Sequence, residues 1–142
     1  MIGKEIKGYR IDSVLGEGGM ATVYSARHEI SGHEVAIKVL DSKLAKDDSI
    51  LTRFRNEATI GKELSHGGIA KVFGFIKIGD NSAFVMEKVS GEPLTKLIES
   101  SPDSFAPDKE QVVLRNLLSE LRYGDELGIV HGDIKEWNIM IE

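Results

Sequence analysis

A glycine-rich segment near the N-terminus has the composition of a loop that could lie against phosphate groups. It reads Gly16-Glu17-Gly18-Gly19 and lies between two stretches of strand-forming residues. Because glycine has no side chain, its backbone can approach a ligand closely. The strand that follows excludes a dinucleotide fingerprint, which needs a helix there, and no Gly-Lys-Ser/Thr follows as in a P-loop. By itself, the segment fits a phosphate-covering hairpin and a flexible hairpin without a ligand equally well.

Lys38 is the second candidate, because it lies within an apolar stretch from Val35 to Leu40. A lysine is rarely left buried without a partner. Its side chain either extends the ammonium group to water or holds an anion such as a phosphate, fixed by a carboxylate. Glu57, on the helix predicted to follow, could supply that carboxylate, although an exposed helix position is the commoner role for a glutamate.

A third group of polar residues lies near the end of the sequence. Asp133, Lys135 and Asn138 occupy a loop that is predicted to lead into a short strand. The residue types alone fit an Asx-rich turn with a solvated lysine. They fit a functional cluster only if the rest of the chain supports one.

The order of the strands and helices that the sequence predicts around these residues indicates an α+β fold. Five strands are expected, with one helix between the third and the fourth, and mostly helical structure after a boundary near Glu87 to Gly91. The predicted strands begin near Tyr9, Thr22, Val35, Val72 and Ala83, the inserted helix runs from Asp47 to about Leu64, and later helices begin near Leu94 and Asp108. The helix from Asp108 carries an apolar stripe of Val113, Leu114, Leu117, Leu118 and Leu121.

Composition bounds the class of protein. The 142 residues suffice for one compact domain, and the apolar and charged fractions of 41% and 29% are those of an ordinary globular chain. A net charge of −5 without a basic cluster argues against nucleic-acid binding. There is no cysteine, and no stretch has the length of a membrane span or the core of a signal peptide. We therefore expect a cytoplasmic protein without a nucleic-acid or membrane partner.

Four motifs in order resemble the eukaryotic-like Ser/Thr protein kinases of bacteria. The segment from Gly16 to Tyr24, followed by Val35-Ala36-Ile37-Lys38, is similar to the kinase glycine loop and strand lysine. Glu57 lies where these kinases have the glutamate that pairs with the lysine. Val85 to Gly91 is similar to the hinge that receives adenine, and His131 to Asn138 to the catalytic loop. The resemblance runs from about Tyr9 to the end of the sequence.

This resemblance implies ATP and Mg²⁺ as cofactors and a defined set of roles. Lys38, fixed by Glu57, would hold the α- and β-phosphates, and Lys135 would face the γ-phosphate. Asp133 would orient the substrate hydroxyl and Asn138 would bind Mg²⁺. The implied nucleotide-binding residues are Gly16, Gly18, Gly19, Val23, Ala36, Lys38, Met86, Glu87 and Val89. The implied fold is a five-stranded antiparallel N-lobe with one helix over residues 1–87, then the hinge and first C-lobe helices over residues 88–142.

The sequence also departs from the family pattern. Ala21 replaces the third loop glycine, and Gly132 replaces the arginine that senses activation-loop phosphate in many kinases. His-Gly-Asp also occurs in small-molecule phosphotransferases, which remain an alternative. The chain ends at Glu142, before the position expected for the Asp-Phe-Gly motif, whose aspartate holds Mg²⁺. We therefore expect weak phosphotransfer or none from this chain by itself.

Three functional hypotheses follow. The first is a Ser/Thr protein kinase acting on a protein substrate, which the pattern Asp-x-Lys-x-x-Asn favours over a Tyr kinase. The second is a non-catalytic, nucleotide-sensing or partner-binding pseudokinase. The third is a scaffold that no longer binds nucleotide, which the presence of Lys38 and Glu57 argues against. For all three, the stripe of Leu114, Leu117, Leu118 and Leu121 predicts a protein partner or self-association.

Overall fold

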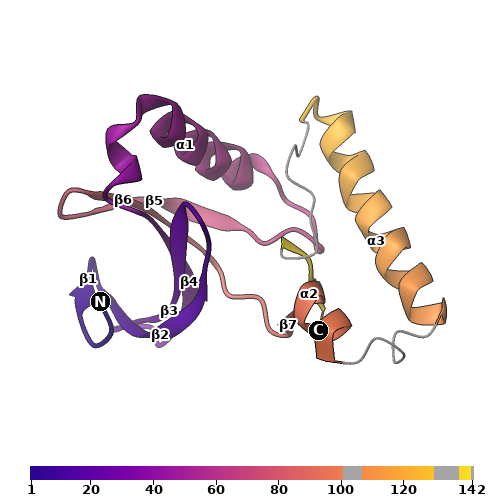
Figure 1. Ribbon diagram of the computed structural model, residues 1–142, viewed down its shortest axis with the longest axis horizontal. Coiled ribbons are helices and arrows are strands. Elements are labelled where there is room, and N and C mark those ends of the chain that lie inside the picture. Colours follow the sequence, from indigo (N-terminus) through magenta and orange to yellow (C-terminus); the bar gives the residue numbers. More distant parts are fainter. Residues whose placement is uncertain (101–106, 130–137, 142) are drawn as a thin grey trace. The chain divides into compact units, whose positions relative to one another are not determined.

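A computed structural model describes residues 1–100, 107–129 and 138–141 (Figure 1). The chain forms two compact units. The first contains Met1–Ser65 and Ala70–Lys88, and the second contains His66–Ile69 and Val89–Glu142. Residues 101–106 of the predicted Ser100 to Pro107 loop, and most of the predicted catalytic loop, fall outside the described residues.

The first unit is built on a curled antiparallel sheet of six strands in the order β1-β2-β3-β4-β6-β5 (Figure 1). The five predicted strands are present, and a two-residue strand, β1, adds one edge that the sequence did not predict. β5 and β6 form a hairpin through Gly79, whose φ of +59° is one that glycine adopts readily. The strands are β1 Glu5–Ile6, β2 Tyr9–Glu17, β3 Ala21–His28, β4 Glu34–Leu40, β5 Val72–Ile78 and β6 Asn81–Glu87.

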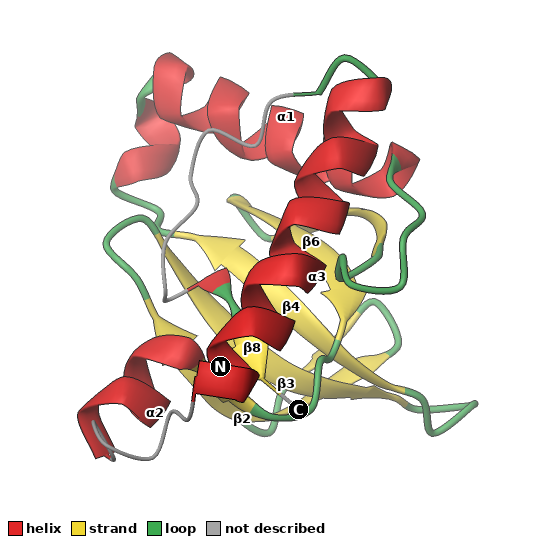
Figure 2. Cartoon of the chain, turned by 90° about the vertical axis from the view of Figure 1, so that its right-hand side faces the viewer, coloured by secondary structure: helices red, strands yellow, loops and turns green. Residues whose placement is uncertain are grey.

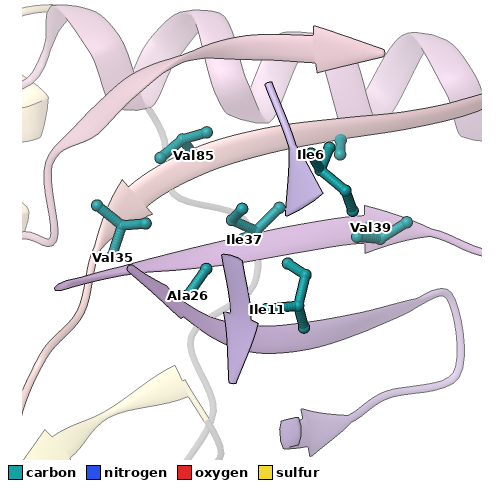
Figure 3. Close-up of a cluster of buried hydrophobic side chains, with 8 residues drawn as sticks. Ile6, Ile11, Ala26, Val35, Ile37, Val39 and Val85 are labelled. Atoms are coloured by element: carbon teal, nitrogen blue, oxygen red, sulfur yellow. The ribbon is translucent and has the colours of Figure 1, made fainter. Parts of the chain in front are cut away.

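One face of the sheet closes on an apolar core. Along β4, alternate residues point to this face, as the two-residue period of a strand requires. Figure 3 shows their side chains meeting those of neighbouring strands. The buried residues of this cluster are Ile6, Ile11, Ala26, Val35, Ile37, Val39, Ala83 and Val85.

Helix α1, Asp48–Glu63, packs against the sheet through a second apolar cluster. Its N-terminus is capped by Asp47, whose carboxylate accepts hydrogen bonds from the backbone N–H groups of Ser49 and Ile50. A short 3₁₀ helix, η1 (Leu44–Lys46), precedes it. Apolar residues at helical spacing face the sheet, which is why the helix is stable there. The buried members of this cluster are Ala21, Leu40, Phe54, Ala58, Val72 and Phe84.

In its described part, the second unit contains two helices and a small two-stranded sheet. Helix α2 spans Leu94–Ser100 and helix α3 spans Pro107–Glu126; helices are red in Figure 2. Strand β7 (Glu92–Pro93) pairs with β8 (Met140–Ile141). Both helices begin within a residue of the predicted positions. Of the predicted stripe on α3, Leu114 and Leu118 are more than half exposed.

A groove of 420 Å³ lies beside the stripe within the second unit. Its lining residues are Leu94, Ile98, Glu110, Val113, Leu114, Leu117 and Ile139. None of the helices in residues 1–100 and 107–129 is long and apolar enough to cross a membrane.

Candidate functional site

The structure pairs Lys38 with Glu57. The Lys38 ammonium Nζ donates a hydrogen bond to Glu57 Oε1 at 2.5 Å, and so joins β4 to α1. Lys38 is 26% exposed at its side chain and Glu57 52%, so the pair is open to solvent on one side. The same Nζ lies 5.7 Å from the centre of the Phe84 ring, close enough for a cation–π contact. The lysine therefore has a fixed position with part of its charge still available to a ligand.

The strand register places other predicted site residues on the same face as Lys38. Val23 of β3 lies directly opposite Lys38, and Met86 of β6 lies directly opposite Ala36. Residues directly opposite one another share a face, and so do residues two apart on one strand. Val23, Ala36, Lys38 and Met86 are therefore neighbours on the face opposite the Figure 3 core. Ala36 is buried, whereas Val23 and Met86 are half-buried.

The glycine-rich segment ends β2 with Gly16 and Glu17 and begins the turn to β3 with Gly18 and Gly19. The backbone N–H of Gly18 donates to the carbonyl oxygen of Ala21 at 2.9 Å, which closes the turn. A Cβ added at Gly16 or at Gly19 would meet no atom within 4 Å, and at Gly18 the nearest atom would be 3.5 Å away. The space beside this backbone is therefore open, as a loop that approaches phosphate groups requires.

The end of β6 is held by its own hydrogen bonds. The backbone N–H of Glu87 donates to the carbonyl oxygen of Lys71 at 2.8 Å, and the backbone N–H of Lys71 donates to Glu87 Oε2 at 3.1 Å. Glu87 and the neighbouring Met86 thus have a defined backbone where the sequence predicts the adenine contacts.

These residues fit a nucleotide. The Lys38 ammonium group suits the negative charge of a polyphosphate, and the open glycine backbone allows phosphates to approach. The half-buried side chains of Val23 and Met86 offer an apolar surface to a base, with the buried Ala36 on the same face. For Mg²⁺, the only predicted ligand within the described residues is Asn138.

The remaining predicted site residues are not among the described residues of the first unit. Val89 and Asn138 belong to the second unit, and Asp133 and Lys135 lie outside the described residues. The roles of all the predicted site residues, including these four, stay predictions.

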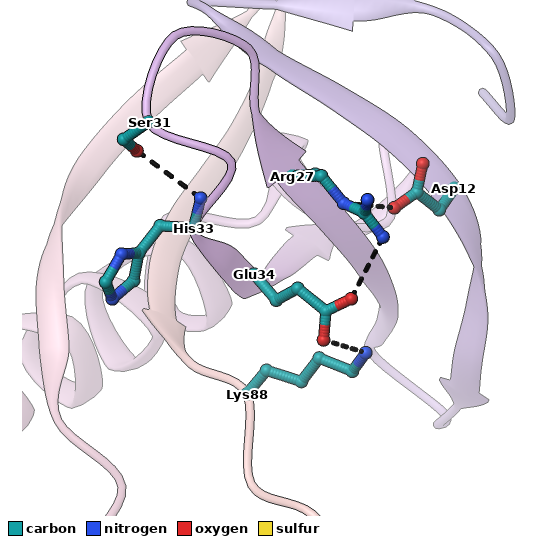
Figure 4. Close-up of polar contacts among 6 residues, drawn as sticks. All are labelled: Asp12, Arg27, Ser31, His33, Glu34 and Lys88. Carbon is teal, nitrogen blue, oxygen red and sulfur yellow. Dashed lines mark hydrogen bonds and ion pairs between the residues drawn. The ribbon is translucent and has the colours of Figure 1, made fainter.

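Sequence reasoning missed two features near this face. One is Phe84, whose ring contacts Lys38 because β6 pairs with β4, a pairing that a single sequence does not reveal. The other is a charged row drawn in Figure 4, in which Glu34 bridges Arg27 and Lys88. No local pattern pointed to it, because Lys88 is 54 residues from Glu34 along the chain. The hydrogen bond from Lys88 is the largest of the effects that lower the pKa of the Glu34 carboxyl, followed by the charges of Lys88 and Arg27.

Comparison with known proteins gives consistent results. A family model described as a protein kinase domain matches residues 9–142. The probable serine/threonine-protein kinase PknB of Corynebacterium glutamicum is 36% identical over 137 residues, which cover 94% of this chain and 21% of that protein. The serine/threonine-protein kinase PrkC of Bacillus subtilis is 36% identical over 143 residues, covering 100% and 22%.

Solved structures show the same fold. A mutant form of the Mycobacterium tuberculosis PknI kinase domain superposes with a TM-score of 0.83 at 25% sequence identity, covering 99% of this chain and 57% of that one. Of the full length of PknB and PrkC, this chain spans about a fifth.

Proposed function

Because the chain belongs to the protein kinase family, we propose that it binds ATP with Mg²⁺ and takes part in phosphotransfer to Ser or Thr hydroxyls of a protein. Members of this family generally use ATP and Mg²⁺. The observation that supports the proposal most is the Lys38–Glu57 ion pair, because protein kinases need a lysine–glutamate pair in place for activity.

Each residue of the first unit has a task in this proposal. Lys38 donates from its ammonium group to α- and β-phosphate oxygens, and Glu57 keeps that group at the open edge of the face. Gly16, Gly18 and Gly19 let the turn backbone cover the phosphates. Val23, Ala36 and Met86 contact the adenine, with backbone groups of Glu87 and Val89 hydrogen-bonding to its edge.

The bound nucleotide and metal would supply the transferable γ-phosphoryl group and the neutralising charge. We assign Asn138 as a metal ligand, Asp133 as the residue that orients the substrate hydroxyl, and Lys135 as a contact of the γ-phosphate, on the sequence pattern alone. The same pattern supports a division into an N-lobe over residues 1–87 and a second part over residues 88–142.

The test is a calorimetric titration of ATP into the purified chain, with and without Mg²⁺. We expect Lys38→Met to weaken binding about tenfold or more, because a hydrogen bond to a charged group contributes roughly 1.5–3 kcal/mol. Lys77→Met is the matched control: Lys77 is an exposed lysine of the edge strand β5, which does not pair with β4, and its loss should leave the affinity unchanged.

Two outcomes would contradict the proposal. One is the absence of ATP binding by the wild-type chain at millimolar ATP. The other is equal binding by wild type and Lys38→Met, which would mean that the nucleotide does not use this face. Binding that depends on Lys38 but gives no phosphotransfer in a labelling assay would favour the nucleotide-sensing alternative.

Two further assignments belong to this proposal. We assign the exposed residues of the α3 stripe, above all Leu114 and Leu118, to a protein partner, since exposed apolar residues grouped beside a groove are typical of such contacts. A cytoplasmic location fits the absence of cysteine.

A further inference from the structure

A row of charged side chains crosses the first unit at one end of the strands. Glu34 uses both carboxylate oxygens: Oε1 accepts from Arg27 Nη2 at 3.1 Å, and Oε2 accepts from Lys88 Nζ at 2.9 Å (Figure 4). Arg27 Nε in turn lies 4.0 Å from Asp12 Oδ2. One carboxylate thus connects β3, β4 and the residue after β6.

The register explains why these residues meet. Arg27 is the cross-strand partner of Glu34. Val35 is the partner of Glu87, so the next pair in the same antiparallel register is Glu34 with Lys88. β6 ends at Glu87 and the regular pairing stops there. The Lys88–Glu34 ion pair therefore continues the attachment to β4, through side chains, for one residue beyond the strand.

The row lies on the same face as the candidate nucleotide residues. Glu34, Ala36 and Lys38 alternate along β4, so they point to one face and follow one another at intervals of about 6–7 Å. On β3, Arg27 shares this face with Val23, because the two residues are four positions apart on the strand. In the proposed function, Lys38 marks the phosphate end and Ala36 the base end. Glu34 then lies just beyond the base.

Lys88 has a sensitive position in the chain. It is the last residue of the first unit, and the chain continues from it to Val89 of the second. It also separates Glu87 from Val89, the two residues whose backbone groups are proposed to contact the adenine edge. Hydrogen bonds weaken steeply with misplacement, so the backbone at Lys88 has to be held in place for both contacts to form.

We propose that Glu34 is a positioning residue for the base: by holding Lys88, it fixes the backbone from Glu87 to Val89 in the conformation that binds adenine. This inference rests on the proposed function and deepens it, since it assigns the recognition of the base to a residue that does not touch the nucleotide. Half-exposed ion pairs are individually weak, so the effect should be on adenine affinity and local order, with little effect on global stability.

The experiment compares three probes by calorimetry: ATP, adenosine and inorganic tripolyphosphate. For Glu34→Gln we expect ATP and adenosine to bind roughly twofold to fivefold more weakly, with tripolyphosphate unchanged, because the phosphate end does not depend on Lys88. Lys88→Gln should have the same effect, and the double variant should be no worse than either single one. Glu29→Gln, an exposed glutamate in the turn before β4, is the matched control and should bind all three probes like wild type.

Hydrogen exchange of the ligand-free chain gives a second readout. Exchange at the backbone amides of Lys88 and Val89 should quicken in Glu34→Gln and remain unchanged in Glu29→Gln. An unaltered adenosine affinity in Glu34→Gln, in a chain whose wild type binds ATP, would overturn this inference and leave the proposed function standing. Equal losses for adenosine and tripolyphosphate would also overturn it, since they would indicate a general loss of structure. Failure of the wild type to bind ATP would remove both proposals.

Discussion

The ion pair of Lys38 with Glu57 fixes the position of the lysine but contributes little to folding stability. Its partner Glu57 is 52% exposed, and ion pairs in contact with water contribute about 0–1 kcal/mol to folding. The same pair fixes a cation beside the open glycine turn, where a polyphosphate can compete for or share it. The value of the pair therefore lies in the placement of charge, and its loss should be felt in binding more than in unfolding.

Ser82 is the opposite case, a buried polar group without an evident task. It is 1% exposed, and its hydroxyl has no hydrogen-bond partner among the described residues. A buried hydroxyl left unsatisfied costs about 1–3 kcal/mol. We expect Ser82→Ala to raise the free energy of unfolding by about 1 kcal/mol in urea denaturation. The exposed Ser13→Ala on β2 should change it little; a loss of stability in Ser82→Ala would show that the hydroxyl is bonded.

At the scale of elements, the contact between α1 and β5 depends on a glycine. A Cβ added at Gly61 would lie 2.5 Å from Val72 Cγ2 and 3.3 Å from Val72 Cβ, far inside normal contact. Alanine is favoured over glycine in a helix by about 1 kcal/mol, but overpacking costs about 1–3 kcal/mol. The two effects oppose one another. Because the branched side chain of Val72 is rigid, we expect the cost of overpacking to exceed the gain in helix propensity.

We therefore expect Gly61→Ala to lower the free energy of unfolding by about 1 kcal/mol, measured by urea denaturation. Lys62→Ala, at the next and exposed position of α1, is the control and should be nearly neutral. When Gly61→Ala is combined with Val72→Ala, the loss in free energy of unfolding should be smaller than the sum of the two single losses, because Val72→Ala removes the clash. A stabilised Gly61→Ala would mean that helix propensity prevails at this contact.

The elements were largely predictable because their signals are local. Asp47 precedes a helical apolar pattern and indeed caps α1. The mostly apolar stretch around Lys38 predicts a well-covered strand, and β4 lies between β3 and β6. β1 was missed because a two-residue strand carries no periodicity. The contact of Lys38 with Phe84 and the pairing of Glu34 with Lys88 were missed for another reason. They depend on the order of strands in the sheet, which a single sequence does not reveal.

At the scale of the whole molecule, the chain is a kinase-family sheet and helix joined to a smaller helical unit. It passes between the units at three places, after Ser65, after Ile69 and after Lys88. Only the passage after Lys88 follows a strand of the candidate nucleotide face, β6. The Glu34–Lys88 pair therefore lies where this face continues into the second unit of the chain. The overall resemblance to kinases was predictable, because its motifs are short and keep their order along the sequence.

The proposed function depends most on Lys38, which, held by Glu57, is expected to contact the phosphates of ATP. The most direct measurement follows the NMR signals of the Lys38 side-chain Cε and Nζ, assigned by their loss in Lys38→Met, during titration with ATP and separately with adenosine. We predict that ATP shifts these signals and adenosine does not, since only ATP carries phosphates. Binding of ATP, seen elsewhere in the spectrum, that leaves the Lys38 signals in place would contradict the account.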